Sequence, residues 1–345
     1  MADVELDFEG PIHELKRKIE ELESFAESTE MDMQGQIAEL RQRCEDLQRE
    51  TFAKLSPWER VQVARHPQRP VFSDYRSATF SDTLELHGDQ GAGDDPAIFT
   101  GFAKLRGRSV VLLGHRKGKN TKERIRCNFG SAQPEGYRKA LRVMRLAEKF
   151  KLPVIALIDT PGAYPGVTAE ERGQAQAIAR NIMEMARLKT PVVCVVIGEG
   201  GSGGALGIGV GDRVLMLEHA YYSVISPEGC SSILWKSAEE ASTAAQILRL
   251  TAADLSEFGI VDEVIEEPLG GAHQSLPDAC ARLEDALVRN LEPLLGLSTE
   301  ALLEQRYAKV RKIGSFLEDG VPQGYVPPHL RSEASEPNHL RSEAS

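Results

Sequence analysis

The fold of this chain is decided by two stretches, LPVIALIDTPGAYPG (Leu152 to Gly166) and PVVCVVIGEGGSGG (Pro191 to Gly204). Each opens with a continuous apolar run, which is typical of a strand buried on both faces of a parallel sheet. Each run ends in a glycine-rich loop. The segments before the two runs, 135–151 and 170–189, carry apolar residues at helical spacing. Buried strands that alternate with helices predict an α/β core.

The sequence on either side extends this core. A predicted β-hairpin, AIFTGFAKL and SVVLLGH around Gly107, precedes it, and DRVLMLEHAYYSVIS and IVDEVI supply later strands. Apolar residues at helical spacing on both sides of Gly35 predict an N-terminal helical hairpin. We also expect helices over 237–258, 278–295 and 299–313.

These patterns divide the chain into consecutive parts. They are an N-terminal helical segment (1–73), a core domain (74–295), a C-terminal helix (296–320) and a tail (321–345). The tail contains HLRSEAS twice, at 329–335 and 339–345, after a proline-rich PPH. It lacks the apolar residues needed to bury a core, so we expect it to be disordered.

Composition and charge exclude several classes of protein. The chain has 345 residues, with 41 Lys and Arg against 52 Asp and Glu, and a formal charge of −11. This acidic balance argues against nucleic-acid binding, which needs surplus Lys and Arg. The 5 cysteines form no CxxC pair, which argues against a disulfide framework or a metal site on this chain and favours a reducing compartment. No stretch approaches the ~18 apolar residues of a membrane span, so we expect a cytoplasmic protein.

The two glycine-rich loops are the candidate functional site. Loops after the strands of an α/β sheet are where ligands bind. Glycines let ligand atoms approach the backbone, whose amide groups can stabilise a developing oxyanion without a charged side chain. The candidates are Gly162 and Ala163 in the first loop and Gly201, Ser202, Gly203 and Gly204 in the second.

The second loop also matches a dinucleotide-binding motif. Gly198, Gly200 and Gly203 satisfy the pattern G-x-G-x-x-G. Only residues 205–212 separate Gly204 from the next predicted strand. A parallel crossover normally takes a dozen or more residues, which argues against a dinucleotide-binding fold.

A hydrolase motif overlaps the same loop. The residues around Ser202 satisfy G-x-S-x-G, and Asp262 and His273 follow in the chain order of a hydrolase triad. Several glycines in one frame make accidental matches common. The simpler interpretation is that Ser202 caps the helix that follows the loop.

A basic loop follows the predicted hairpin. It runs from His115 to Arg126 and contains one acid, Glu123. Its cations are Arg116, Lys117, Lys119, Lys122, Arg124 and Arg126. In an acidic chain this cluster could hold a phosphorylated cofactor or an acidic partner, or it could be a solvated loop. His66 and His115 have no acid or nucleophile beside them in sequence that would form a dyad, so we interpret both as structural.

Several long motifs occur between about Leu6 and Gly314. They are ARHPQRP (64–70), NFGSAQPEGYRKALR (128–142), IDTPGAYPG (158–166), AEERGQ (169–174), IGEGGSGGALGIGVGD (197–212) and YSVISPEGCSSILWK (222–236). Together they closely resemble the carboxyltransferase alpha subunit of the bacterial and plastid type of acetyl-CoA carboxylase. This resemblance implies a crotonase-like (ClpP/crotonase) fold, a superhelix of repeated ββα turns.

The resemblance also implies a reaction and its partners. In this family the carboxyl group of carboxybiotin, held on a biotin carboxyl carrier protein, is transferred to acetyl-CoA to give malonyl-CoA for fatty-acid synthesis. The alpha subunit pairs with a zinc-ribbon beta subunit in an α2β2 assembly, and the biotin carboxylase component uses ATP. The biotin is attached to the carrier and not to this chain, which holds no metal.

The resemblance implies roles for the candidate residues by their positions. The backbone amides of Gly203 and Gly204 match the family's oxyanion pair, which faces the ureido oxygen of biotin. The residues expected to shape the same carboxybiotin-binding cleft are Gly162, Ala163, Gly201 and Ser202. The residues considered for contact with CoA or the carrier are Arg116, Lys117 and Lys119. Two alternative functions stay open. The chain could be a single-chain acyl-CoA hydratase or hydrolase of the same fold, or a dinucleotide-binding protein.

Overall fold

The computed structural model describes residues 6–29, 32–91, 93–318 and 321–324. Its centre is an 8-stranded sheet in the order β1-β2-β3-β4-β5-β6-β8, with β7 paired to β5. The strands are β1 (Ser81–Glu85), β2 (Ile98–Leu105), β3 (Arg108–His115), β4 (Val154–Thr160), β5 (Val192–Gly201), β6 (Arg213–Leu217), β7 (Tyr221–Ser223) and β8 (Glu263–Ile265). The strands β1, β2 and β3 pair antiparallel, and those from β3 to β8 pair parallel.

This topology confirms the predicted hairpin and the predicted parallel strands. Because β4 and β5 run parallel, their carboxyl ends lie at the same edge of the sheet, and both glycine-rich loops start there. The edge strand β1 was not predicted. Its sequence, SDTLE, is mostly exposed and has no apolar alternation that would mark a strand.

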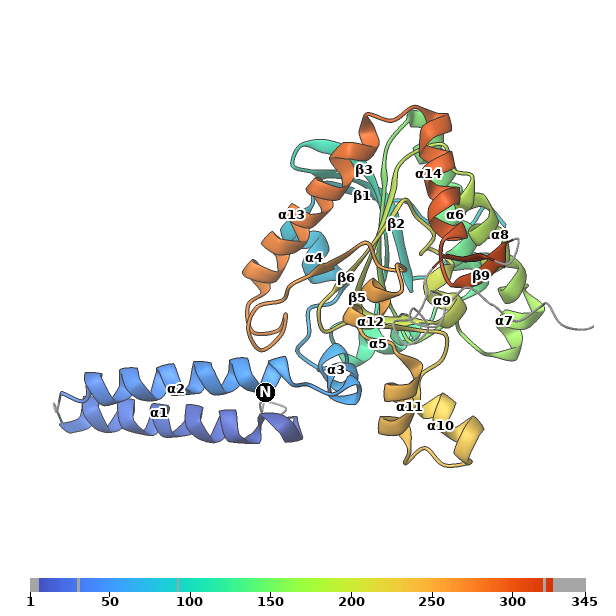
Figure 1. Ribbon diagram of the computed structural model, residues 1–345. Coiled ribbons are helices and arrows are strands. Elements are labelled where there is room, and N and C mark those ends of the chain that lie inside the picture. Colours follow the sequence, from blue (N-terminus) through green and yellow to red (C-terminus); the bar gives the residue numbers. More distant parts are fainter. Residues whose placement is uncertain (1–5, 30–31, 92, 319–320, 325–345) are drawn as a thin grey trace, which may run out of the picture.

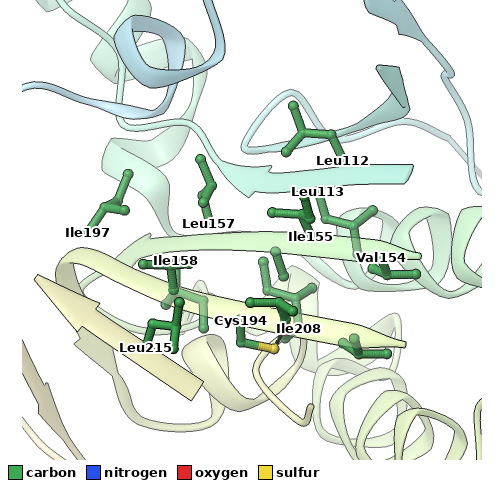
Figure 2. Close-up of a cluster of buried hydrophobic side chains, with 14 of the residues drawn as sticks. Leu112, Leu113, Val154, Ile155, Leu157, Ile158, Cys194, Ile197, Ile208 and Leu215 are labelled. Carbon is green, nitrogen blue, oxygen red and sulfur yellow. Dashed lines mark hydrogen bonds between the residues drawn. The ribbon is translucent and has the colours of Figure 1, made fainter. Parts of the chain in front are cut away.

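Helices cover both faces of the sheet (Figure 1). On one face lie α4 (Phe72–Thr79) and α13 (Leu276–Leu295), and on the other lie α6 (Pro134–Phe150), α8 (Gln174–Ala186) and α14 (Thr299–Arg311). The apolar strands therefore have no solvent-facing side. Figure 2 shows side chains from β3, β4, β5 and β6, including Leu112, Ile155, Cys194 and Leu215, packed in this core, and all four are fully buried.

The remaining helices are short or lie outside these layers. They are η1 (Asp7–Glu9), α1 (Gly10–Thr29), α2 (Gln34–Ala53), α3 (Pro57–Ala64), α5 (Thr121–Arg126), η2 (Asn128–Gly130), α7 (Val167–Glu171), α9 (Ser202–Leu206), α10 (Pro227–Trp235), α11 (Ala241–Leu248) and α12 (Ala252–Glu257). The helices α1 and α2 form the predicted hairpin, which projects from the body of the protein (Figure 1). Its apolar stripe includes Ile12, Ile19, Ile37 and Cys44.

Two predicted helices are each interrupted. The segment 170–189 is divided between α7 and α8 because Gly173 adopts a φ of +82°, which ends the first helix. The segment 237–258 is divided between α11 and α12. Arg249 has a φ of +49°, and the Thr251 side chain accepts a hydrogen bond from the Asp254 amide and starts a new helix.

The C-terminal part differs from the prediction in its described residues. The helix α14 ends at Arg311, and β9 (Ser315–Glu318) pairs antiparallel with β10 (Val321–Gly324). The sequence predicted a helical segment to 320 and a disordered tail from 321, so the strand pair is a correction. The rest of the predicted tail, 325–345, lies outside the described residues. The division of the chain into domains stays a prediction.

None of the helices in the described ranges is both long enough and apolar enough to cross a membrane.

Candidate active site

The two glycine-rich loops lie directly against each other. A Cβ atom placed on Gly204 would lie 2.4 Å from the amide nitrogen of Ala163, and one placed on Gly201 would lie 2.2 Å from the carbonyl oxygen of Pro161. Gly162 adopts a φ of +150°, a conformation that other residues rarely adopt. The structure therefore brings together the two loops that the sequence singled out, with no space for a side chain between their backbones.

The second loop leads into α9, and Gly201 is its N-cap residue. The first amides of a helix have no acceptor within the helix. Gly203 and Gly204 belong to this first turn of α9. Gly204 is buried and Gly203 is half-buried. The arrangement thus places first-turn backbone donors beside the Gly162 loop, the kind of group that an oxyanion site uses.

The hydrolase triad suggested by the sequence is not assembled. Ser202 follows β5 at the carboxyl edge of the sheet, whereas Asp262 precedes the parallel strand β8 and so lies at the amino edge. The Asp262 carboxylate accepts a hydrogen bond from the Val214 amide and pairs with Lys309. The Ser202 side chain is exposed and does not cap α9. The capping role expected for Ser202 is corrected as well.

The dinucleotide motif lacks its structural context. The helix α9, which follows the matching glycines, has only 5 residues. A dinucleotide site needs a longer crossover helix after the glycine-rich turn. The objection raised from the spacing along the chain is therefore confirmed.

A buried ion cluster lies beneath the two loops. The Lys117 ammonium lies 2.8 Å from Oδ1 of Asp159 and donates to Oε1 of Glu199 at 2.5 Å. The other oxygen of Glu199 accepts hydrogen bonds from Arg65 Nε at 2.7 Å and from the Tyr221 hydroxyl at 2.6 Å. Burial by itself would raise the pKa of the Glu199 carboxyl, but Lys117 and Arg65 outweigh it and lower that pKa to about 2. Glu199 is therefore ionised at neutral pH.

A cavity of about 280 Å³ opens beside this cluster. It joins the ARHPQRP segment, the basic loop and the ends of β4 and β5. Its lining includes Arg65, His66, Arg69, Lys117, Arg124, Phe129, Asp159, Pro161 and Glu199. Three of these residues were not predicted from the sequence as site residues: Arg65, Asp159 and Glu199. The available signal was that Asp159 and Glu199 each stand at the start of a glycine-rich loop.

The cations proposed to contact CoA or the carrier are paired within the chain. Arg116 makes hydrogen bonds of 2.8 and 2.7 Å to Glu85, and Lys119 pairs with Asp74. Lys117 points inward to the cluster described above. In the described part of the chain, the basic-loop cations that form no ion pair are Lys122, Arg124 and Arg126. The contact with CoA or the carrier stays a prediction, and these cations are the ones with free charge.

The two histidines interpreted as structural have different surroundings. His66 stacks on His273, with ring centroids 4.1 Å apart. His115 is fully buried at the end of β3, beside the backbone of Gly204. Burial lowers the pKa of His115 to about 3. The ring is therefore neutral at physiological pH.

Acid should destabilise the protein through His115. The unfolded chain takes up a proton near pH 6.5, whereas the folded protein does so only near pH 3, so stability falls as the pH drops through this range. We expect this histidine to contribute a loss of about 2 kcal/mol at pH 5 relative to pH 7. This loss is measured by urea unfolding of the wild-type protein and of His115→Leu at pH 7 and at pH 5. If both proteins lose the same stability between pH 7 and 5, the interpretation is wrong.

Comparison with known proteins identifies the family. The chain matches the family model described as acetyl co-enzyme A carboxylase carboxyltransferase-like over residues 5–314. The acetyl-coenzyme A carboxylase carboxyl transferase subunit alpha of Halalkalibacterium halodurans is 55% identical over 312 residues, which cover 90% of this chain and 96% of the relative. The subunit of the same name from Thioalkalivibrio sulfidiphilus is 56% identical over 313 residues, which cover 91% and 98% of the two chains.

Solved structures confirm the predicted crotonase-like α/β fold. Transcarboxylase 12S superposes with a TM-score of 0.53 at 21% identity, over 66% of this chain and 43% of that chain. The beta subunit of geranyl-CoA carboxylase from P. aeruginosa has a TM-score of 0.53 at 15% identity, over 72% and 46%. A Pseudomonas malonate decarboxylase hetero-tetramer has a TM-score of 0.52 at 20% identity, over 64% of this chain and 90% of that chain. At these identities the likeness shows the fold. The family model and the relatives of 55% and 56% identity show that this chain belongs to the family of carboxyltransferase alpha subunits of acetyl-CoA carboxylase.

Proposed function

We propose that this chain, paired with a beta subunit, transfers the carboxyl group of carboxybiotin to acetyl-CoA and forms malonyl-CoA for fatty-acid synthesis. The observation that carries this proposal is the direct backbone contact between the two glycine-rich loops at Gly204 and Ala163. It leaves backbone amides, rather than a nucleophilic side chain, as the groups available to a reacting oxygen. The carboxybiotin is held on a carrier protein, and a biotin carboxylase that uses ATP supplies it. We expect the protein to act in the cytoplasm.

The reaction needs little acid–base chemistry from side chains. Carboxybiotin, when the carrier presents it, would supply both the carboxyl group and the base that the acetyl methyl group requires, so this chain would mainly have to bind and orient the reacting groups. The amides of Gly203 and Gly204 would stabilise the charge that develops on the ureido oxygen. The loop residues Gly162 and Ala163, with Gly201 and Ser202, would form the walls of the cleft.

An exposed apolar surface supports the pairing with a second subunit. Its exposed apolar side chains lie beside or on α10 and α11, two helices that pack against each other, and are Val224, Ile233, Leu234, Trp235 and Ile247. Large apolar side chains that are exposed together on neighbouring elements favour association with another protein. Figure 1 shows α10 and α11 projecting from the body on the side where α9 lies.

This apolar surface is connected to the buried cluster. Arg65 makes a salt bridge to Glu228, which belongs to α10, and also to Glu199 at the end of β5. A partner that covers α10 and α11 would therefore lie next to the cavity. We propose that the beta subunit binds here in an α2β2 assembly and closes the site.

A charged side chain on this surface should weaken association with the beta subunit without unfolding the chain. We expect Ile233→Asp to weaken binding of the beta subunit at least about 10-fold, because it would desolvate a carboxylate in an apolar interface. The Ile233 side chain is 62% exposed, so the free chain should unfold at the same temperature. The matched control is Val310→Asp on α14, which is 53% exposed and remote from α10. Coelution with the beta subunit measures the effect, and equal binding by both variants would contradict it.

Reconstitution tests the function itself. The chain is coexpressed with the beta subunit, and malonyl-CoA is measured after addition of acetyl-CoA and carboxylated carrier protein. We expect malonyl-CoA only when both subunits and the carboxylated carrier are present. Turnover of an acyl-CoA by the chain alone, without biotin, would instead support the hydratase or hydrolase. Saturable binding of NAD would support the dinucleotide-binding alternative.

A further inference from the structure

The pairing between β4 and β5 is irregular where the second glycine-rich loop begins. Ile158 of β4 pairs with Val196 of β5. The next pair joins Thr160, two residues further along β4, to Gly200, four residues further along β5. The extra residues on β5 form a bulge around Gly198. Bulges redirect a strand and the groups that follow it. This bulge therefore determines where β5 delivers Gly201 and Gly204.

Charged side chains satisfy the backbone groups of the bulge. Oδ1 of Asp159 accepts a hydrogen bond of 3.0 Å from the Glu199 amide, and Nε of Arg69 donates to the Ile197 carbonyl at 3.0 Å. A Cβ atom on Gly198 would lie 2.6 Å from Oδ1 of Asp159, so this carboxylate is packed directly on the bulge. The shape of the bulge consequently depends on Asp159 staying in place as an acceptor.

The positive charge of Lys117 balances the negative charges of Asp159 and Glu199. Its ammonium contacts Asp159 and Glu199 together, whereas Arg65 and Tyr221 contact only the far oxygen of Glu199. Asp159 and Glu199 are both buried, with 3% and 6% of their surfaces exposed. Lys117 is the cation that lies between the two carboxylates, whereas Arg65 contacts the far oxygen of Glu199. Without Lys117 the two negative charges would face each other directly, which favours movement or protonation of one carboxyl group.

We infer that Lys117 is a positioning residue for carboxyl transfer, which holds Asp159 and Glu199 together and thereby keeps the β5 bulge in the shape that places Gly201 and Gly204 against the first loop. This role differs from the contact with CoA or the carrier expected from the basic loop. It deepens the proposed function and rests on it only for the activity assay.

The first test is Lys117→Met in the reconstituted complex. We expect kcat for malonyl-CoA formation to fall about 10²-fold, the scale of a small misplacement of catalytic groups. The KM for acetyl-CoA should stay within about 3-fold, because the inferred role does not involve binding CoA. The activity deficit should shrink as the pH is lowered from about 8.5 to about 6.5, because a proton on one carboxyl then replaces the missing ammonium.

The second test is charge compensation. In the double variant Lys117→Met/Glu199→Gln the carboxamide can still accept hydrogen bonds, but the surplus negative charge is gone. We expect kcat of the double variant to be at least about 5-fold higher than kcat of Lys117→Met. The matched control is Lys309→Met. The Lys309 side chain is 15% exposed against 18% for Lys117, and it pairs with Asp262 at the opposite edge of the sheet. This variant should retain the wild-type kcat.

Each other outcome has a defined meaning. If Lys117→Met raises KM for acetyl-CoA and leaves kcat unchanged, Lys117 is a CoA contact and the inference is wrong. If the deficit is the same at every pH and the double variant is no better, Lys117 acts through packing alone, which also overturns it.

If the wild-type complex makes no malonyl-CoA, the proposed function fails but the inference is still decided by unfolding. If the pKa of one carboxyl group is raised in the folded Lys117→Met protein, the free energy of unfolding of that protein falls as the pH rises. The destabilisation relative to wild type should then be larger at about pH 8.5 than at about pH 6.5, and a constant difference would refute the inference.

Discussion

Gly204→Val should abolish carboxyl transfer while the protein stays folded. The position has no room for a Cβ atom, which would lie 2.4 Å from the Ala163 nitrogen and 2.6 Å from the Gly162 carbonyl carbon. Because these are backbone atoms, the side chain can be accommodated only by separating the two loops. The Gly204 amide then no longer lies where the reacting oxygen binds, and removal of one such donor costs about 10²- to 10³-fold in rate. We expect a loss of at least that size.

The strands are not expected to change in this variant, because the contact lies beyond their ends. Circular dichroism and thermal unfolding test this, and malonyl-CoA formation by the reconstituted pair tests the loss of activity. Gly203→Ala is the graded comparison, since its Cβ would meet only Ile178, at 3.7 Å, and should cost less than about 10-fold. Gly296→Ala, whose Cβ would meet only the Pro293 carbonyl oxygen at 4.0 Å, should have wild-type activity. Normal transfer by Gly204→Val would refute the role given to the loop contact.

Arg69→Met should strongly destabilise the protein. Arg69 makes a two-pronged salt bridge to Glu267, at 2.9 and 2.6 Å, and donates to the Ile197 carbonyl. Glu267 also accepts hydrogen bonds from the amides of His219 and Ala272. The two charged side chains are 4% and 1% exposed, so the variant would leave an uncompensated carboxylate in the interior. We expect the free energy of unfolding to fall by about 3–5 kcal/mol.

Urea unfolding measures this loss, with Arg249→Met as the matched control. Arg249 also pairs with two carboxylates, those of Asp254 and Glu257, but its side chain is 46% exposed. Exposed ion pairs contribute at most about 1 kcal/mol, so the control should be nearly as stable as the wild type. If both variants lose the same stability, burial does not determine the strength of the Arg69 pair. The Arg69 variant should also lower activity in its folded fraction, because Arg69 holds the bulge at Ile197.

The sequence predicted the glycine-rich loops but not the cluster beneath them. Glycines at the ends of two apolar runs are a local signal, because the strand, its end and the loop are contiguous in the chain. The cluster has no such signal. Lys117 and Glu199 are 82 positions apart, and Arg65 and Glu199 are 134 positions apart. Glu199 stands at the start of a glycine-rich loop, but nothing near Lys117 or Arg65 in the sequence indicates that either cation is directed toward it.

The interrupted helices show the same limit on a smaller scale. The segment 237–258 has helical spacing throughout, so its pattern predicts one helix. The chain nevertheless turns at Arg249, where φ is +49°, and Tyr222 donates its amide to the Leu250 carbonyl there. This contact with a strand outweighs the small preference for continuing the helix. The predicted boundaries failed where a tertiary contact competed with local preference.

By itself, the sequence determined the order of the core strands from β2 to β6, the helical segments between them, the buried parallel core and the two loops at the ends of β4 and β5. These features follow from apolar periodicity and from the conformational freedom of glycine, both of which act over a few residues. Only the tertiary structure decided that Lys117 points inward, that β5 bulges at Gly198 and that the two loops touch at Gly204. The physical reason is that a cation in a loop has the same local preferences whether it is solvated or buried. Its direction is set by carboxylates that reach it only after the sheet has formed.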